Sequence, residues 1–468
     1  MKTVIIQKGI LNDLKPLIDK YNKIHMPKLK IDVAVFFIGL INELNSHYRD
    51  DEMENNNHFI PLYSNILKNY HSGYNRYFVF LVCAGLLDKD NYGADIAKSN
   101  SYKITDTYIN DELVSYPITY NKLIEKFNEK GLDKYQQEKI KDCIKKRPQL
   151  MTIFNDSLTI DANAAYNEVK HLKDVEPKKH NNAIVLIKEF NNQEWKASIK
   201  PYTDNRLHTN LTRSPKVLRK HILVNNENIA GCDIKTSQPY FFCVVLKAII
   251  RKDKELLEKV KATKVLNGNA IEQLFNLEID KNEVIDFVLS VVDEKTDFYN
   301  YFQTKLDIKI DENGQPFRIV SNFKSKDKGK RKRKPNEDFE SHTKKFYPTK
   351  RDLAKEVVME IFYSSPMSKM SEAVIFREKY PSIHKIIKCI NDNGIKFSQL
   401  LTSIEAYILL DVVAKQINDK HPKMPLGSIH DCLVTTRKQQ GFLHEEMLRL
   451  IEQATTLKVK IDKEQWNN

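Results

Sequence analysis

The segment from Asn205 to Cys243 constrains the fold of this chain more than any other part of its 468 residues. A short apolar run, residues 229–232, predicts a strand, and Asp233 follows it directly, with a helix expected from about Ser237. A carboxylate at a strand end suits a metal ion that meets phosphates; the alternative is that Asp233 caps the helix. The basic residues that precede the strand are Arg206, Arg213, Arg219 and Lys220.

The composition points to a polyanionic partner, because the formal net charge is +13 and the pI is about 9.1. Six cysteines are scattered without a CxxC pair, which argues against a zinc knuckle or a disulfide framework and is typical of a reducing compartment. The N-terminus lacks a signal-peptide pattern, and no run approaches the roughly 18 apolar residues of a membrane span. We therefore expect a soluble, cytoplasmic protein without a membrane partner.

The first region, residues 1–185, is expected to be mainly helical. Apolar residues recur at helical spacing over 33–44 and 77–81, and the alternating segment 99–109 predicts a short hairpin. This order is similar to a winged helix near residues 30–110, although helices followed by a hairpin are common. A boundary near residue 185 would separate this region from a second one, residues 186–468.

A basic loop is expected over residues 322–350. Its section Lys324 to Lys334 holds eight basic residues in eleven and no apolar residue, which predicts a solvated segment. Such a loop suits a nucleic-acid backbone or a nuclear-import signal; a charged surface loop is the alternative.

The segment Thr349 to Met367 predicts a helix with a mixed stripe. Spacings of three or four residues place Arg351, Lys355 and Met359 on one face, followed by Phe362 or Tyr363. The cations suit the phosphates of a nucleoside triphosphate, and the aromatic end suits its base or sugar. Without other features, an amphipathic surface helix would be the simpler interpretation.

A third segment, residues 425–436, presents the pair His430 and Asp431 between apolar residues, with a strand expected over 433–436. A carboxylate at such a bend can complete a metal site begun elsewhere in the chain. An Asp in a turn is the simpler interpretation of this pair alone.

Taken in order, the three segments resemble the motifs of the family A and phage-type single-subunit nucleic acid polymerases. Asp233 comes first, then Arg351 and Lys355 with Tyr363 eight positions after the Lys, then the pair His430 and Asp431. The resemblance covers roughly residues 200–440. It implies an α+β, helix-rich fold with the palm, fingers and thumb of a right hand, and an expected helix over 398–413 matches a helix that such enzymes place before the His-Asp hairpin.

The resemblance also implies a role for each matching residue. Asp233 and Asp431 would hold two magnesium ions, for which Mn²⁺ could substitute, and Lys355 would be catalytic. Residues expected to contact the nucleotide, primer end or phosphates are Arg351, Lys355, Met359, Tyr363, Gln238, His430, Arg206 and Arg213. The implied partners are nucleoside triphosphates and a nucleic-acid template or primer.

Three positions depart from the family's pattern, and a fourth, Met359, distinguishes its DNA enzymes from its RNA enzymes. Gln238 stands where the DNA enzymes carry Glu and the RNA enzymes Gly, so this position does not decide the sugar. Met359 matches the phage-type RNA enzymes and favours ribonucleotides. Ser364 and Cys432 replace residues common after the Tyr and after the His-Asp pair, and neither removes a metal ligand.

The chain is much shorter than the phage-type RNA polymerases. We therefore expect a nucleotidyltransferase of a polymerase or primase type, such as a reduced enzyme of a mobile element. Two other classes stay open: a non-catalytic nucleic-acid-binding protein on a polymerase-like scaffold, and a metal-dependent nuclease, for which the triphosphate helix has no purpose.

Overall fold

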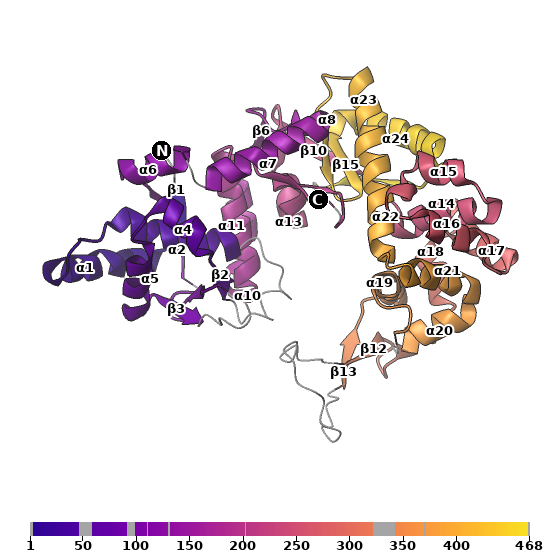
Figure 1. Cartoon of the computed structure of the whole chain (residues 1–468), viewed down its shortest axis with the longest axis horizontal. Coiled ribbons are helices and arrows are strands. Elements are labelled where there is room, and N and C mark those ends of the chain that lie inside the picture. The colour runs from indigo at the N-terminus through magenta and orange to yellow at the C-terminus, as the bar shows by residue number, and fades with distance from the viewer. Residues whose placement is uncertain are drawn as a thin grey trace. The chain divides into compact units, whose positions relative to one another are not determined.

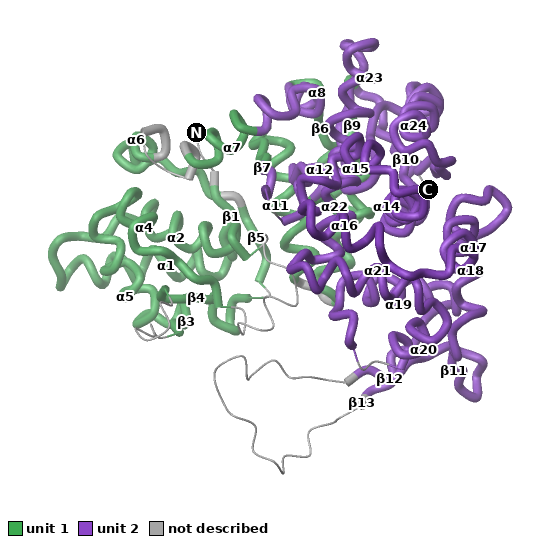
Figure 2. The backbone as a smooth tube through the Cα atoms, turned by 45° about the vertical axis from the view of Figure 1, so that its right-hand side comes forward, with its two compact units in different colours: residues 1–142, 156–197, 213–225 green, residues 143–155, 198–212, 226–468 purple. Residues whose placement is uncertain are grey.

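The computed structural model describes residues 3–45, 59–90, 99–109, 111–129, 132–201, 203–321, 342–368 and 371–466. Helices predominate, and several small antiparallel sheets make the fold α+β, as expected. The chain divides into two compact units (Figure 2): unit 1 holds residues 1–142, 156–197 and 213–225, and unit 2 holds residues 143–155, 198–212 and 226–468. The units interleave along the sequence, and residue 185, the expected boundary, lies within helix α11 (Pro177–Asn191).

Unit 1 is built on α2 (Ile31–Asn45), a helix whose residues 32–41 are all buried. Such an all-round apolar helix belongs in the interior of a domain. The other elements of its first part are β1 (Thr3–Gln7), α1 (Lys8–Ile24), β2 (Ile60–Pro61), α4 (Ser64–Tyr70), α5 (Tyr74–Cys83), β3 (Leu87–Asp90), β4 (Ser101–Ile104) and β5 (Leu113–Pro117). Strand β1 pairs with β5, and β2, β4 and β3 form an antiparallel sheet in that order.

The hairpin of this region differs from the one expected over residues 99–109. Strand β4 pairs with β3, with Leu87 opposite Ile104, so one of its strands precedes the expected segment. Alternation in the sequence identified only β4. The chain between the strands, residues 91–98, lies outside the described residues, and the winged-helix interpretation stays a prediction.

Unit 2 contains the sheet that carries the two predicted metal ligands. Its antiparallel strands lie in the order β14 (Gly427–Ile429), β15 (Cys432–Thr436), β10 (Glu227–Ile234) and β16 (Ile461–Gln465). Gly231 allows close packing over β10, because a Cβ there would lie 2.5 Å from the sulfur of Cys432 and 3.0 Å from the Trp466 ring. A larger residue at 231 would have to displace the side chains of Cys432 and Trp466.

Helices surround this sheet (Figure 1). Helix α14 (Ser237–Arg251) is almost wholly buried, and Phe242 contacts Phe287, Phe362 and Phe397 edge-to-face. The aromatic cluster joins α14 to the helices that carry these rings. The further helices are α15 (Lys254–Lys259), α16 (Gly268–Phe275), α17 (Lys281–Val292), α18 (Phe298–Gln303), α19 (Lys350–Tyr363), α20 (Ser371–Lys379), α21 (Pro381–Asp392), α22 (Phe397–Ala406), η4 (Tyr407–Val413), α23 (Ala414–Lys420) and α24 (Gln440–Thr455).

The helix expected over 398–413 is present as α22 and the π-helical η4. With α23 it forms a stretch, Phe397–Lys420, that is long and apolar enough to cross a membrane by length and composition, although 67% of its most apolar window is buried within the structure. No run of this kind was expected from sequence. Arg147 pairs with Asp411 of η4 at 2.7 Å, so polar contacts also hold the π-helical segment.

The C-terminal part of the expected basic loop is a strand. Residues 322–341, which include Lys324 to Lys334, lie outside the described residues. His342–Phe346 forms β13, which pairs with β12 (Pro316–Ser321), and β12 also pairs with β11 (Lys309–Ile310). The many lysines of this stretch conceal the strand in the sequence.

Candidate active site

One cavity of about 670 Å³ in unit 2 is lined by residues from all three predicted segments. Asp233 lies near the end of β10 and Asp431 in the two-residue turn between β14 and β15. The register places Asp233 opposite Cys432, and the backbone N–H of Ile234 donates to the carbonyl of Asp431 at 3.4 Å. Strand pairing therefore brings together two carboxylates that are far apart in sequence.

Asp233 lies in an unfavourable electrostatic environment. Burial, followed by the charge of Asp431 and those of Glu464 and Asp462, raises the pKa of Asp233 to about 7, while Lys355 acts in the opposite direction. Like charges held close together in a half-buried site favour binding of a proton or a cation. Asp233 also does not cap α14, because the N-cap residue is Thr236.

His430 forms the turn beside Asp431 and has a positive φ of 53°. This left-handed backbone is uncommon for a residue other than glycine. It lets the chain reverse within two residues, so that β14 and β15 pair directly and the side chains of both turn residues line the cavity.

Helix α19 supplies the opposite wall of the cavity. It begins after the N-cap Thr349, whose side chain accepts a hydrogen bond from the backbone N–H of Asp352. Residues of the predicted stripe that line the cavity are Arg351, Lys355, Met359 and Tyr363. Phe362 is buried in the aromatic core, which leaves Tyr363, 51% exposed, as the aromatic residue that α19 contributes to the cavity. The helix ends with Ser364 in extended conformation, so no glycine is required there.

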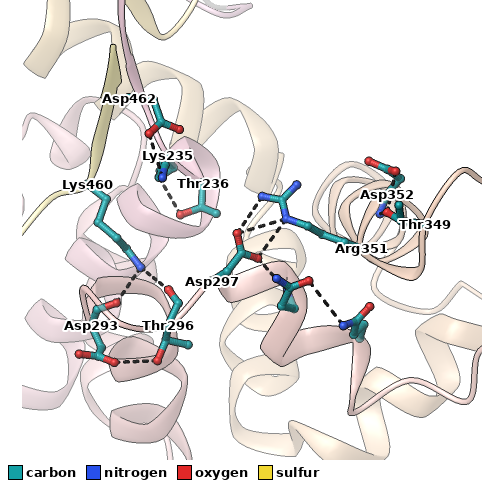
Figure 3. Close-up of polar contacts among 12 residues, drawn as sticks. Lys235, Thr236, Asp293, Thr296, Asp297, Thr349, Arg351, Asp352, Lys460 and Asp462 are labelled. Carbon is teal, nitrogen blue, oxygen red and sulfur yellow. Dashed lines mark hydrogen bonds and ion pairs between the residues drawn. The ribbon is translucent and has the colours of Figure 1, made fainter. Parts of the chain in front are cut away.

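Arg351 is held by a residue that the sequence analysis did not identify. Asp297 accepts hydrogen bonds from Arg351 Nε and Nη2 at 2.9–3.2 Å (Figure 3). The guanidinium lies 5.3 Å from the centre of the Tyr299 ring. Burial alone would raise the pKa of Asp297, but the hydrogen bonds from Arg351 and from the backbone of Asn300 outweigh it and lower the pKa. Asp297 and Tyr299 line the same cavity.

The loop that carries Asp297 is also fixed to the sheet. Lys460, which precedes β16, donates to the carbonyl oxygens of Asp293 and Thr296 at 2.8 and 2.7 Å (Figure 3). Lys235, two residues after Asp233, pairs with Asp462 of β16 at 2.8 Å. Cations and carboxylates thus alternate around the cavity.

Glu405 of α22 holds three residues of the cavity wall. It is 1% exposed; Oε1 accepts from Arg206 Nε at 2.8 Å, and Oε2 accepts from Ser237 Oγ at 2.7 Å and Gln238 Nε2 at 2.6 Å. Burial is the main reason that the pKa of Glu405 is raised to about 7, and Asp431 adds to the effect. Arg206 and Gln238 are therefore held at fixed positions in the cavity wall.

Gln238 keeps one acceptor available. Its amide nitrogen donates to Glu405, and within the described part of the chain its buried Oε1 has no hydrogen-bond partner. A buried acceptor without a donor is destabilising.

No protein-family model and no curated protein matches the sequence. Among solved structures, the chain is similar to the POL domain of Pol1 from M. smegmatis, in complex with DNA primer-template and dNTP. The TM-score is 0.37 and the identity 11%, over 74% of this chain and 73% of that chain.

Arg213 is the one predicted site residue that does not line the cavity. It belongs to unit 1, where Nη1 donates to Glu189 Oε2 at 2.8 Å. Glu189 also pairs with Lys196, so the arginine neutralises a buried carboxylate. A basic residue seven positions after Arg206 looks equivalent to it in sequence, because the buried partner is not visible there.

The donor set of the cavity fits Mg²⁺. Among the described residues no group of three His, Cys, Asp or Glu side chains forms a complete metal cage. Mg²⁺ is commonly held by one or two carboxylates together with substrate phosphates, and Asp233 and Asp431 provide such a pair. Burial is the main reason that the pKa of Asp233 is raised, and the neighbouring carboxylates add negative charge that a cation would neutralise.

Proposed function

We propose that this chain is a template- or primer-dependent nucleotidyltransferase of an RNA-polymerase or primase type that uses magnesium. The observation that carries the proposal is the single cavity lined by Asp233 and Asp431 on one wall and by Arg351, Lys355 and Tyr363 on the other. A nuclease would need the carboxylates alone, and a binding scaffold would need neither wall.

In this proposal each wall has its own task. Asp233 and Asp431 would hold Mg²⁺, which when bound would favour ionisation of a 3′-hydroxyl and offset charge on the phosphates. Arg351 would bind the triphosphate, with Lys355 beside the leaving pyrophosphate. Lys355 would also serve as its general acid.

Preference for ribonucleotides is supported by Gln238 and Met359, which both line the cavity. Gln238 Oε1 is buried and has no donor in the described part of the chain; turned toward the cavity on binding, it would accept a hydrogen bond from a ribose 2′-hydroxyl, which a deoxyribose lacks. A site that hydrogen-bonds a substrate hydroxyl discriminates strongly against the analogue without it. His430 would lie near the primer end, and Arg206 would contact phosphates.

The decisive experiment is extension of a labelled primer-template, and of template alone, with magnesium and either ribo- or deoxyribonucleotides. Asp233→Ala and Asp431→Ala should abolish the product, and ribonucleotides should be preferred. Nucleic acid bound without product in any condition would instead support the binding-protein alternative. Metal-dependent binding of a nucleoside triphosphate that is lost in Lys355→Ala would exclude both alternatives.

A further inference from the structure

The small sheet β11-β12-β13 has two chemically different faces. Antiparallel pairing places Phe317 opposite Phe346 and Ile319 opposite Lys344, and side chains directly opposite each other share a face. Lys309 of β11 lies opposite Phe317 on the same face. We call these five residues the aromatic-lysine face.

The aromatic-lysine face is turned to solvent. Ile319 is 46% and Phe346 44% exposed, Phe317 is half-buried, and both lysines are exposed. The two rings lie with centres 5.8 Å apart, and the Lys344 ammonium lies 4.7 Å from the centre of the Phe317 ring. Apolar surface of this kind on a charged sheet marks an interaction site more often than a requirement of folding.

The opposite face anchors the sheet to α19. Arg318, 4% exposed, pairs with Glu360 at 2.5 Å and Glu356 at 3.6 Å on α19 and with Glu372 of α20 at 3.5 Å. Lys345 pairs with Glu356 at 2.7 Å. The carboxylates of this region are thereby used on the anchored face, while the charged members of the aromatic-lysine face are lysines.

Aromatic rings beside lysines suit one ligand chemistry. Bases of a single strand stack on exposed rings without regard to sequence, and lysines offset the adjacent phosphates. A duplex keeps its bases stacked internally and has no use for the rings. The strands β12 and β13 are also joined by a sequence containing eight basic residues in eleven, Lys324 to Lys334, which adds positive charge to the same polypeptide segment.

We propose that the aromatic-lysine face binds the single-stranded template. The choice of the template as ligand rests on the proposed function. In that function α19 binds the incoming nucleotide through Arg351 and Lys355, and the template strand just beyond that nucleotide is unpaired. Figure 1 shows β12 and β13 beside α20, next to α19 in the chain. The ion pairs of Arg318 and Lys345 thus anchor the sheet to the helix that carries Arg351 and Lys355.

The test uses labelled DNA hairpins that carry a 5′ overhang, a 3′ overhang or a blunt end, with binding to the full chain measured by fluorescence anisotropy. Phe317→Ala with Phe346→Ala should weaken binding of the 5′ overhang by roughly tenfold or more. An overhang of abasic sites should bind weakly to both proteins, with little difference between them. Phe442→Ala is the matched control, since Phe442 is an exposed ring (38%) elsewhere in unit 2.

Phe346→Ala and Phe346→Tyr separate stacking from folding, because tyrosine keeps the ring and should restore binding. Unchanged affinity in the double variant, or an equal loss on the blunt hairpin, would overturn the proposal. A loss confined to the 3′ overhang would overturn the template assignment, and a changed molar mass with unchanged affinity would identify a second copy as occupant. Ring-dependent binding without any primer extension would leave this face standing while the proposed function fails.

Discussion

Asp233 and Asp297 line the same cavity but have pKa values shifted in opposite directions. Asp233 is half-buried among other carboxylates, with Asp431 beside it. Asp297 receives two donors of Arg351 and a backbone N–H. One wall therefore carries clustered negative charge that Lys355 offsets only in part, and the other is neutralised before any ligand arrives.

The difference teaches how each wall is prepared for a charged ligand. The register of β10 with β15 forces Asp233 and Asp431 together, and only a proton or a cation relieves the repulsion. On the helical wall, by contrast, a phosphate that binds Arg351 must replace Asp297 as the partner of the arginine. A bound metal ion would relieve the repulsion at the first wall. At the second wall, the phosphates of a nucleotide would have to compete with Asp297 for Arg351.

The largest expected effect is loss of the carboxylate wall. Asp233→Ala and Asp431→Ala should each lower the rate of incorporation by at least about a hundredfold, since charge stabilisation by a metal is worth several kcal/mol. The double variant should be scarcely slower than either single one, because both act as a unit. Single-turnover incorporation measures all three rates.

Asp462→Ala is the matched control for that series. Asp462 lines the cavity and also raises the pKa of Asp233, but it pairs with Lys235 and its side chain is 52% exposed. Its loss should change the rate only a few-fold. A loss as large as that of Asp233→Ala would mean that the metal site is not the pair proposed here.

Lys355→Ala should have the next largest effect, about a hundredfold on kcat, because a positioned general acid contributes on that scale. Lys355→Arg keeps the charge but not a readily released proton, so it should restore nucleotide affinity without restoring kcat. The measurement is single-nucleotide incorporation over a range of nucleotide concentrations and pH. Unchanged incorporation by Lys355→Ala at saturating nucleotide would remove the general-acid role.

Substitutions in the helical wall should have smaller effects, and they should change KM for the nucleotide in opposite directions. Arg351→Ala should raise KM for the nucleotide about tenfold, the effect of losing a charge-assisted hydrogen bond. Asp297→Asn should lower KM a few-fold, because the phosphate no longer competes with a carboxylate for Arg351. If Asp297→Asn raised KM instead, Asp297 would be a positioning residue for the arginine rather than a competitor.

Local signals explain which parts were predictable from sequence. The start of α19 at Thr349, the strand before Asp233 and the strand after Asp431 follow from caps and apolar runs within a few residues. The role of Glu405 could also have been predicted, because a carboxylate inside the apolar run SIEAYILL is expected to be buried and therefore paired.

Other parts depend on contacts that no local pattern records. Arg351 donates hydrogen bonds to Asp297, which lies 54 positions earlier in the sequence, and Arg213 donates to Glu189 within unit 1. The interleaved units likewise arise from short segments that join one core or the other, so a single boundary could not describe them. Pairing at long range, rather than propensity, decided these features.

The smallest expected effect tests the electrostatics of the carboxylate wall without any substrate. Because the pKa of Asp233 is about 7 when folded, against an ordinary 3.8, the folded state binds the proton more strongly than the unfolded state. The free energy of unfolding should therefore fall as pH rises from about 4 to about 7 when metal is absent. Asp233→Asn removes that contribution, and Glu405, with a similarly raised pKa, retains its own.

In thermal unfolding with a chelator, Asp233→Asn should exceed the wild type by a few degrees in Tm at about pH 8 and match it at about pH 4. Magnesium should raise the Tm of the wild type at the higher pH and leave that of Asp233→Asn nearly unchanged. A variant destabilised equally at both pH values would show that repulsion between Asp233 and Asp431 is relieved within the chain, and the need for a cation at this wall would disappear.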